Sequence, residues 1–233
     1  MNIGLFGYGK MGKMIEKIAI QRNHSIVAKI DVDTKEVDYS ALDMAIDFSS
    51  PEAAFNNIKS CLEHNVPVIS GTTGWLQNYD KVISFCKEKN GAFIYASNFS
   101  LGVNLFFELN SYLAKLMSKL PLYKVSIEET HHLQKLDAPS GTAISLAEGI
   151  IQNSDYKGWE MAKSRDQHLP IISKRIADEY GTHVVSYENL EDEIAIKHKA
   201  NNREGFALGA VIAAEWLNGK KGVFTMKDVL NLG

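Results

Sequence analysis

Cysteine, net charge and long apolar runs are all scarce in this sequence, and each shortage excludes a class of protein. The two cysteines, Cys61 and Cys86, provide neither a disulfide framework nor the paired spacing of a zinc site, so we interpret them as small buried side chains in a reducing compartment. The formal net charge of −3 leaves no basic field to attract nucleic acid. The apolar runs are far shorter than a membrane span, and no basic segment precedes the first of them, so no signal peptide is expected. These absences predict a cytoplasmic protein that binds neither nucleic acid nor membranes.

The first hundred residues alternate short apolar runs with amphipathic segments. Strands are predicted at residues 2–7, 25–30, 44–48, 66–70 and 92–95. The helices predicted between them include residues 10–21 and a segment with Pro51 in its first turn. Strands that alternate with helices form parallel sheets, because each helix carries the chain back to the start of the next strand. The pattern therefore predicts an α/β fold whose N-terminal part is a Rossmann-type parallel sheet.

The pattern changes after Asn98. A long helix is predicted at residues 101–118, strands at 124–130, 171–176, 182–188 and 193–199, a helix at 205–217 and a short strand at 222–225. Strands clustered in this way predict a second α+β domain built on a mixed sheet. Residues 153–169 are polar and irregular, and we expect them to be a surface loop. We expect one domain over residues 1–98, completed by 205–233, and a second over residues 99–204, with the pivot near 201–205.

A glycine-rich turn separates the first predicted strand from the first predicted helix. It consists of Gly7, Tyr8, Gly9, Lys10, Met11 and Gly12. Glycines with this spacing allow a tight turn, close approach of the backbone to a pyrophosphate and close helix–strand packing, and the helix start offers free N–H groups to phosphates. The strand–turn–helix context predicts dinucleotide binding. The alternative is a glycine-rich turn that holds no ligand.

An acidic residue ends the second predicted strand. Asp31 lies about 20 residues after Gly12, where a carboxylate takes the ribose hydroxyls of a dinucleotide. Because a carboxylate there repels a 2′-phosphate, it favours NADH over NADPH. Lys29 and Lys35 are near in the sequence and would weaken that preference. The alternative is an ordinary aspartate at a strand end.

Two further segments follow the fourth and fifth predicted strands, at the edge of the sheet where open α/β proteins bind ligands. The first contains Gly71, Thr72, Thr73 and Gly74, and the second contains Ala96, Ser97, Asn98 and Phe99. The glycines would let the backbone approach a flat nicotinamide ring, and the Asn98 amide would face its carboxamide. Taken alone, the first segment is equally a simple turn, and Asn98 is equally a helix cap.

The densest group of reactive side chains lies between residues 128 and 142. His131, His132 and Lys135 follow a predicted strand, and a short turn leads from them into a helix that begins near Gly141 and Thr142. Cationic side chains beside the free N–H groups of a helix start form a site suited to a dicarboxylate. A histidine there can also donate a proton near neutral pH.

The paired histidines also fit other roles. A His–His pair also suggests a metal site, but no third ligand has a recognisable spacing, so no metal is expected. Adjacent strand residues point to opposite faces, so one of the two histidines is equally a structural residue. The remaining histidines have no such neighbours in the sequence and are interpreted as surface or structural residues: His24, His64, His168, His183 and His198.

Together these segments resemble one family, the 4-hydroxy-tetrahydrodipicolinate reductases, also called dihydrodipicolinate reductases, of bacterial lysine and diaminopimelate synthesis. The matching stretches are residues 7–12, 47–49, 71–74, 97–100, 129–142 and 209–210, so they span nearly the whole chain. The string HHLQKLDAPSGTA, from His131 to Ala143, is the most specific of them. The resemblance implies NAD(P)H-dependent reduction of (2S,4S)-4-hydroxy-2,3,4,5-tetrahydrodipicolinate to tetrahydrodipicolinate, with loss of water.

The resemblance also implies a role for each candidate residue. His131 would be the general acid/base, Lys135 the second catalytic residue, and His132, Gly141 and Thr142 would hold a substrate carboxylate. The nucleotide would lie on residues 7–12, Asp31, residues 71–73 and residues 96–99, and the family implies a homotetramer assembled through the sheet of the second domain. Val32 stands where many relatives carry an arginine that grips a 2′-phosphate. This departure strengthens the expectation that NADH is preferred, with NADPH also accepted.

Two other functions are alternatives to the reductase. A relative that acts on another substrate, such as an aspartate dehydrogenase or an oxidoreductase of sugars, is expected to lack the turn from Asp137 to Thr142. A non-catalytic NAD sensor needs the glycine turn but no cationic pocket. The chain has both the turn and the cationic residues, and these favour the reductase.

Overall fold

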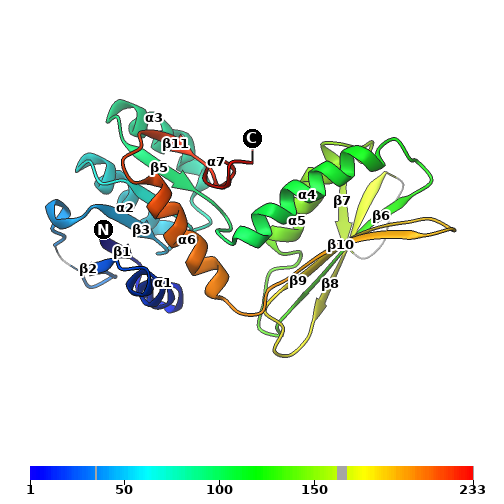
Figure 1. The fold of residues 1–233 in the computed structure, drawn as a ribbon, viewed down its shortest axis with the longest axis horizontal. Coiled ribbons are helices and arrows are strands. Elements are labelled where there is room, and N and C mark those ends of the chain that lie inside the picture. Colours follow the sequence, from blue (N-terminus) through cyan, green and yellow to red (C-terminus); the bar gives the residue numbers. More distant parts are fainter. Residues whose placement is uncertain (35, 162–166, 233) are drawn as a thin grey trace. The chain divides into compact units, whose positions relative to one another are not determined.

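The computed structural model describes residues 1–34, 36–161 and 167–232. The chain divides into two compact units, each built on a sheet of its own (Figure 1). The first unit is Met1–Leu101 with Glu204–Gly233, and the second is Gly102–Arg203. The nucleotide and substrate roles expected of the two domains stay predictions.

The first unit is a parallel sheet of six strands in the order β11-β5-β4-β3-β1-β2. The strands are β1 (Asn2–Phe6), β2 (Ser25–Ile30), β3 (Met44–Asp47), β4 (Val68–Ser70), β5 (Ala92–Tyr95) and β11 (Gly222–Phe224). The helices are α1 (Lys10–Gln21), α2 (Pro51–Glu63), α3 (Tyr79–Glu88), α6 (Glu204–Leu217) and α7 (Met226–Leu230), with short 3-10 turns at Tyr39–Ala41 and Leu76–Asn78. The predicted Rossmann-type α/β fold is confirmed.

Both faces of this sheet are buried. Because successive strand residues point to opposite faces, Met44 and Ile46 of β3 enter one apolar core with α1 and α6, while Ala45 enters another with α2 and α3. Cys61 and Cys86 lie in the second core as free, buried thiols, which agrees with their predicted role as small apolar side chains. The C-terminal helix α6 supplies buried alanines to the first core, so residues far apart in the chain complete one unit.

The strand order places the loops that contain the candidate nucleotide residues at one edge of the sheet. β1 lies between β2 and β3 in the sheet. The chain adds β2 on one side of β1 and then β3 on the other side, so the direction in which strands are added reverses at β1. Open α/β sheets bind their ligands at the carboxyl ends of the strands, beside such a reversal. The loops that follow β1 and β3 are the two that meet at this point.

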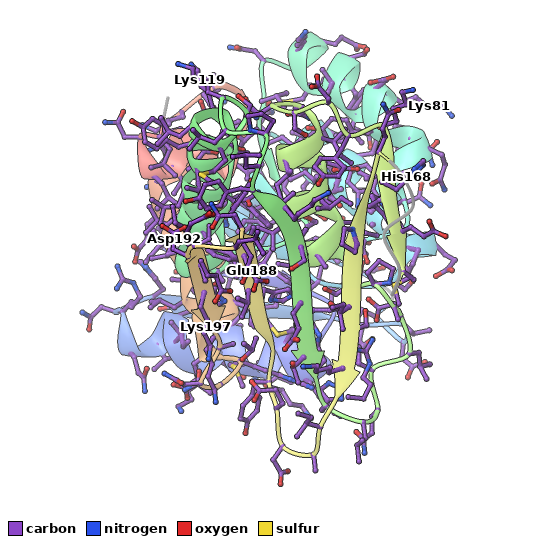
Figure 2. All side chains as sticks on the ribbon, turned by 90° about the vertical axis from the view of Figure 1, so that its right-hand side faces the viewer. Lys81, Lys119, His168, Glu188, Asp192 and Lys197 are labelled. Atoms are coloured by element: carbon purple, nitrogen blue, oxygen red, sulfur yellow. The ribbon has the colours of Figure 1, made fainter. Side chains whose placement is uncertain are left out.

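The second unit is a mixed sheet of five strands in the order β10-β9-β6-β8-β7. The strands are β6 (Lys124–His131), β7 (Gly158–Met161), β8 (His168–Arg175), β9 (Thr182–Glu188) and β10 (Glu193–Lys199). The helices α4 (Leu101–Met117) and α5 (Gly141–Ile151) supply apolar side chains to a core on one face, where they meet Val125 and Ile127 of β6. Figure 2 shows the strands of this sheet with their side chains, including Glu188 of β9 and Lys197 of β10. The predicted mixed sheet is confirmed.

One predicted element is wrong. Residues 153–169 were expected to form an irregular surface loop, but Gly158–Met161 is a strand and β8 already begins at His168. Residues 162–166 of that segment lie outside the described residues. β7 is a four-residue edge strand that pairs in parallel with β8, and so short a strand displays no clear alternation in the sequence.

Among the described residues, no helix combines the length and apolarity needed to cross a membrane.

The three glycines of the first turn differ in their surroundings. Gly7 has a φ of +91°, and a Cβ added there would lie 2.2 Å from the carbonyl oxygen of Phe48. A Cβ on Gly12 would lie 2.3 Å from the carbonyl oxygen of Gly7, so Gly12 allows α1 to pack closely on β1. A Cβ on Gly9 would meet no atom within 4 Å. Gly7 and Gly12 are therefore required by the fold, while Gly9 leaves the backbone open to a ligand.

We expect Gly7→Ala to lower the free energy of unfolding by at least about 2 kcal/mol, because it adds positive-φ strain to a backbone clash. Gly9→Ala is the matched control and is expected to change that free energy by no more than about 0.5 kcal/mol. Urea unfolding of the two variants measures the difference. Equal stability of the two variants would contradict this account of the turn.

Candidate active site

Four loops of the first unit converge at one edge of its sheet. β5, β4, β3 and β1 are consecutive neighbours, and all run in the same direction. The candidate segments 7–12, 71–74 and 96–99 directly follow β1, β4 and β5, and residues 48–50 follow β3. The structure therefore brings together the sequence-predicted nucleotide residues of these segments, and Asp31 follows β2 at the end of the same edge.

A buried carboxylate at the end of β3 joins two of these loops. Asp47 is fully buried, and its Oδ2 accepts hydrogen bonds of 2.7 Å from the hydroxyls of Ser70 and Thr72. Its Oδ1 accepts from the hydroxyl of Ser49 at 2.6 Å and from the side-chain amide of Asn57 at 3.1 Å. Burial raises the pKa of Asp47, against the opposing effect of these donors. No role was predicted for Asp47 from the sequence. Its donors lie on separate elements, and only the folded chain brings them together.

The charge next to Asp31 is neutralised locally. Lys29 Nζ lies 2.7 Å from Glu16 Oε1 and 3.0 Å from the Tyr8 hydroxyl, and it stands over the Tyr8 ring at 4.5 Å from the centroid. The hydrogen bond that Lys29 donates to the Glu16 carboxylate is the main reason why the pKa of Lys29 is raised. Lys29 is thus held against Tyr8 of the glycine turn. The residue after Asp31 is Val32, an uncharged side chain that is 96% exposed. Lys35 lies outside the described residues.

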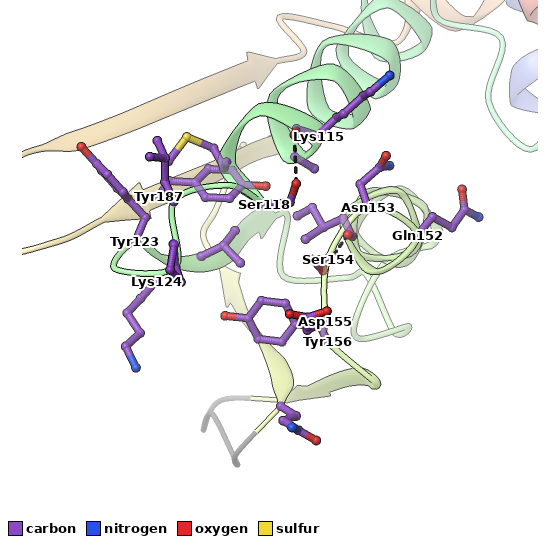
Figure 3. Close-up of a pocket in the computed structure, with 17 residues that line it drawn as sticks. Lys115, Ser118, Tyr123, Lys124, Gln152, Asn153, Ser154, Asp155, Tyr156 and Tyr187 are labelled. Atoms are coloured by element: carbon purple, nitrogen blue, oxygen red, sulfur yellow. Dashed lines mark hydrogen bonds between the residues drawn. The ribbon is translucent and has the colours of Figure 1, made fainter.

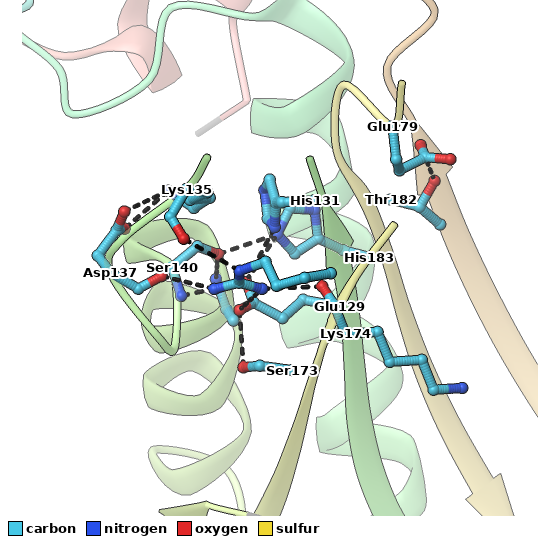
Figure 4. Close-up of polar contacts among 12 residues, drawn as sticks. Glu129, His131, Lys135, Asp137, Ser140, Ser173, Lys174, Glu179, Thr182 and His183 are labelled. Atoms are coloured by element: carbon cyan, nitrogen blue, oxygen red, sulfur yellow. Dashed lines mark hydrogen bonds and ion pairs between the residues drawn. The ribbon is translucent and has the colours of Figure 1, made fainter. Parts of the chain in front are cut away.

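In the second unit, the end of β6 carries a buried polar cluster (Figure 4). Glu129 and His131 are two residues apart on β6, so their side chains lie on the same face. His131 Nδ1 is 3.4 Å from Glu129 Oε2, and His183 Nε2 of β9 is 3.7 Å from the same oxygen. The rings of His131 and His183 meet edge to face with centroids 5.0 Å apart. His183, which was interpreted from the sequence as a surface or structural residue, is thus a buried member of this cluster, because strand pairing supplies contacts that sequence distance does not reveal.

The cluster controls the charge of its members. Burial lowers the pKa of His131 to about 4, and interactions with His183, Lys135 and Arg175 act in the same direction against the raising effect of Glu129. Burial by itself would raise the pKa of Glu129, but the contact with His183 and hydrogen bonds from Ser140 and Ser173 together hold that pKa well below its usual range. Near neutral pH the cluster therefore contains a charged carboxylate beside an uncharged His131 imidazole.

Lys135 and His132 lie on the loop that joins β6 to α5. Lys135 Nζ contacts both carboxylate oxygens of Asp137 at 2.7 Å. His132 Nε2 lies 3.3 Å from the guanidinium of Arg203. Arg175 donates to the backbone oxygens of Lys135 and Asp137 at 3.2 and 2.7 Å, so it fixes the path of the loop. Neither arginine was predicted from the sequence. For Arg175 the signal is the register of β8 against β6, which pairs it with His131.

The loop ends at the first turn of α5. Ser140 is the N-cap, and its hydroxyl accepts a 3.2 Å hydrogen bond from the backbone N–H of Ala143. A Cβ added to Gly141 would meet no atom within 4 Å. The N–H groups at a helix start have no partner within the helix, so this open turn suits an anion. His131, His132, Lys135, Gly141 and Thr142 are thus brought together by the strand end, the loop and the helix start.

Within the described part of the chain, one group has the spacing of metal ligands. Glu129, His131 and His183 each offer a ligand atom, and these atoms lie within 4.8 Å of one another. The Glu129 carboxylate already accepts from Ser140 and Ser173, and Arg175 lies 3.4 Å away. A positive guanidinium at that distance disfavours a second cation. We therefore interpret the group as a hydrogen-bonded cluster.

A cavity of about 740 Å³ lies elsewhere in the second unit (Figure 3). Its lining comes from the ends of α4 and α5 and the start of β6, and includes Lys115, Lys124 and Tyr187. Because Lys124 begins β6 and His131 ends it, the cavity and the histidine cluster lie at opposite ends of one strand. The cavity contains none of the candidate residues.

Known proteins resemble this chain along its whole length. The family models "Dihydrodipicolinate reductase, N-terminus" and "Dihydrodipicolinate reductase, C-terminus" match residues 1–99 and 102–230. A curated 4-hydroxy-tetrahydrodipicolinate reductase from Christiangramia forsetii is 56% identical over 234 aligned positions, which cover 99% of this chain and 98% of the relative.

Solved structures show the same fold. The dipicolinate-bound dihydrodipicolinate reductase from Paenisporosarcina sp. TG-14 has a TM-score of 0.77 at 22% identity, with 97% of each chain covered. GenD2 from gentamicin A biosynthesis, solved in complex with NAD, has a TM-score of 0.61 at 10% identity and covers 99% of this chain and 90% of its own. At these identities the two structures bear on the fold alone.

The environment of His131 makes its titration measurable. We expect its imidazole to gain a proton only as the pH falls to about 4, because burial and neighbouring positive charges oppose the charged form. NMR observation of the ring protons across a pH series gives the midpoint, and the signal is assigned by its loss in His131→Gln. A midpoint near the ordinary value of about 6.5 would contradict this electrostatic account.

Proposed function

The chain belongs to the dihydrodipicolinate reductase family, and we propose that its first unit holds the nicotinamide nucleotide while its second unit holds the substrate and supplies the proton. The protein is an oxidoreductase of lysine and diaminopimelate biosynthesis, and it reduces 4-hydroxy-tetrahydrodipicolinate. The observation that carries the proposed division of roles is the placement of His131, Lys135 and the α5 N-terminus at one end of the second sheet.

The residues of the first unit fit a pyridine nucleotide. Gly9 leaves its backbone open beside the start of α1, where N–H groups and the positive end of the helix dipole suit a pyrophosphate. Asp31 would take the ribose hydroxyls. The nicotinamide end would lie against residues 71–73 and 96–99, at the edge that Asp47 holds together. When bound, the nucleotide supplies the hydride.

The residues of the second unit fit a dicarboxylate. Gly141 and Thr142 present the opening amides of α5 to one carboxylate, with His132 beside Arg203 as further donors. Lys135 reaches the same end of the unit and would exchange its contact with Asp137 for the substrate. The dipicolinate carried by the Paenisporosarcina relative has two carboxylates of this kind, which supports the same substrate class here.

His131 would donate the proton that completes the reduction. Its imidazole is uncharged near neutral pH because burial and the neighbouring charges of Lys135 and Arg175 oppose protonation. Two substrate carboxylates would bring negative charge to this end of the unit and raise the proton affinity of His131. Binding of the substrate would thus charge the proton donor, and a charged imidazole can act as a general acid.

The second unit also offers a surface for assembly. α4 and α5 cover one face of its sheet, while Ser126, Glu128, Ile172, Lys174 and Val184 alternate with the core residues and point to the other face. The proposed assembly is a homotetramer joined through that second face. A cytoplasmic location fits a biosynthetic enzyme with free thiols, and the net charge of −3 speaks against nucleic acid or membrane surfaces as partners.

The wild-type protein should oxidise NADH when the hydroxy-dipicolinate substrate is generated in situ by the preceding synthase. We expect His131→Gln or Lys135→Ala to lower kcat by at least about 100-fold, because each removes a group that acts on the reacting molecule. Steady-state kinetics measures the rate, and calorimetry should find the NADH affinity nearly unchanged. A variant that retained the wild-type rate would exclude its residue from the proposed role, and no wild-type turnover would overturn the function itself.

The wild type is expected to bind NADH more tightly than NADPH, because Asp31 repels a 2′-phosphate and Lys29 is paired with Glu16. Glu16→Gln should release Lys29 and tighten NADPH binding by roughly 3- to 10-fold, with little effect on NADH. Calorimetric titration of both nucleotides tests this. The double variant Glu16→Gln with Lys29→Ala is the control and should lose the gain. A wild-type preference for NADPH would refute the proposed role of Asp31.

A further inference from the structure

Glu129 is the most buried charged group of the second unit's polar cluster, and the roles proposed above leave it without a function. Its side chain is fully buried on β6. Oε1 accepts from the Ser173 hydroxyl at 2.7 Å and lies 3.4 Å from Arg175 Nη1. Oε2 accepts from the backbone N–H of Ser140 at 3.1 Å and faces His131 Nδ1 at 3.4 Å. Each oxygen therefore has partners from other parts of the unit.

The strand register explains how these partners gather. Glu129 pairs with Ser173 of β8 on one side and with His183 of β9 on the other. Residues paired across neighbouring strands point to the same face, and His131 follows on that face two residues later. The three strands thus place a hydroxyl and two imidazoles around one carboxylate, on the face that also carries the apolar core with α4 and α5.

A second set of contacts ties this carboxylate to the helix start. The backbone N–H of Ser140 donates to Glu129, and the Ser140 hydroxyl lies 3.1 Å from His183 Nε2. Ser140 is the N-cap of α5 and is followed by Gly141 and Thr142, whose amides would hold the substrate. Glu129 therefore contacts the proposed proton donor directly and the proposed carboxylate site through its cap residue.

We infer that Glu129 is a positioning residue for the reduction, which holds the His131 imidazole and the N-terminus of α5 in one fixed arrangement, with His183 bridging the two through Ser140. The inference rests on the proposed function of His131. A proton donor must lie within hydrogen-bond reach of the reacting atom while the substrate is anchored elsewhere, so the distance between donor and anchor has to be set by the protein. Glu129 is the group that sets it.

The same carboxylate tunes the charge of His131. The ionisable groups that face His131 are Glu129 on β6, Lys135 on the following loop, Arg175 on β8 and His183 on β9. Only Glu129 favours the protonated imidazole, and the other three oppose it. Loss of the carboxylate therefore makes His131 harder to protonate, and loss of His183 makes it easier. A purely structural role would produce no such opposite effects.

The test compares Glu129→Gln with Glu148→Gln. Glu148 is an exposed acid on α5 that lies outside the polar cluster and outside the sheet face proposed for assembly, so its variant is a matched control. Glu129→Gln should lower kcat by at least about 10-fold and shift the alkaline fall of the kcat profile to lower pH by about one unit. The KM for NADH should stay within about 2-fold, since the nucleotide is proposed to lie on the first unit. Glu148→Gln should match the wild type in all three measurements.

His183→Gln provides an independent arm should Glu129→Gln fold poorly, as judged by circular dichroism and urea unfolding. It should shift the alkaline fall to higher pH, in the direction opposite to Glu129→Gln. Equal behaviour of the Glu129 and Glu148 variants, or an unshifted profile in folded Glu129→Gln and in His183→Gln, would overturn the inference. Absence of turnover in the wild type would instead overturn the proposed function, so the two failures are distinguishable.

Discussion

A carboxylate that is removed from water must find a full set of donors, and this requirement organises both units of the protein. An unpaired buried charge costs several kcal/mol, so the surrounding elements have to supply hydrogen bonds from fixed directions. Asp47 meets the requirement in the first unit with Ser49, Asn57, Ser70 and Thr72. Glu129 meets it in the second unit with Ser140, Ser173 and Arg175. In each case the donors come from different strands, loops or helices, and the carboxylate joins them.

Asp47 and Glu129 differ in the charge of the groups that surround them. The donors of Asp47 are neutral hydroxyls and an amide, and burial raises its pKa. Glu129 has an arginine and two histidines within 4 Å, and its donors hold its pKa well below the usual range. Asp47 thus fixes the geometry of the loops after β3 and β4. Glu129 fixes geometry and also contributes a negative charge beside the imidazole that is proposed to carry the proton.

Charge placement follows the same logic at the nucleotide end. Lys29 is near enough to the glycine turn to attract a phosphate, but Glu16 and the Tyr8 hydroxyl hold its ammonium group. Asp31 is the charged residue directly after β2, and the next residue, Val32, is uncharged. In the proposed nucleotide site, preference between two nucleotides that differ by one phosphate would therefore depend on an ion pair between α1 and β2 as well as on the residue at the strand end.

The sequence by itself determined the parallel sheet, the glycine turn, the mixed second sheet and the segment from His131 to Thr142. These features depend on local patterns, namely periodicity, turn residues and short motifs, which are readable without a partner in space. Tertiary structure alone decided that Gly158–Met161 is a strand, that His183 and Arg175 flank His131, and that Glu129 joins them to Ser140. The physical reason is register: which residues of β6, β8 and β9 stand opposite one another is decided when the sheet assembles, and a shift of one residue would turn every one of these side chains to the other face.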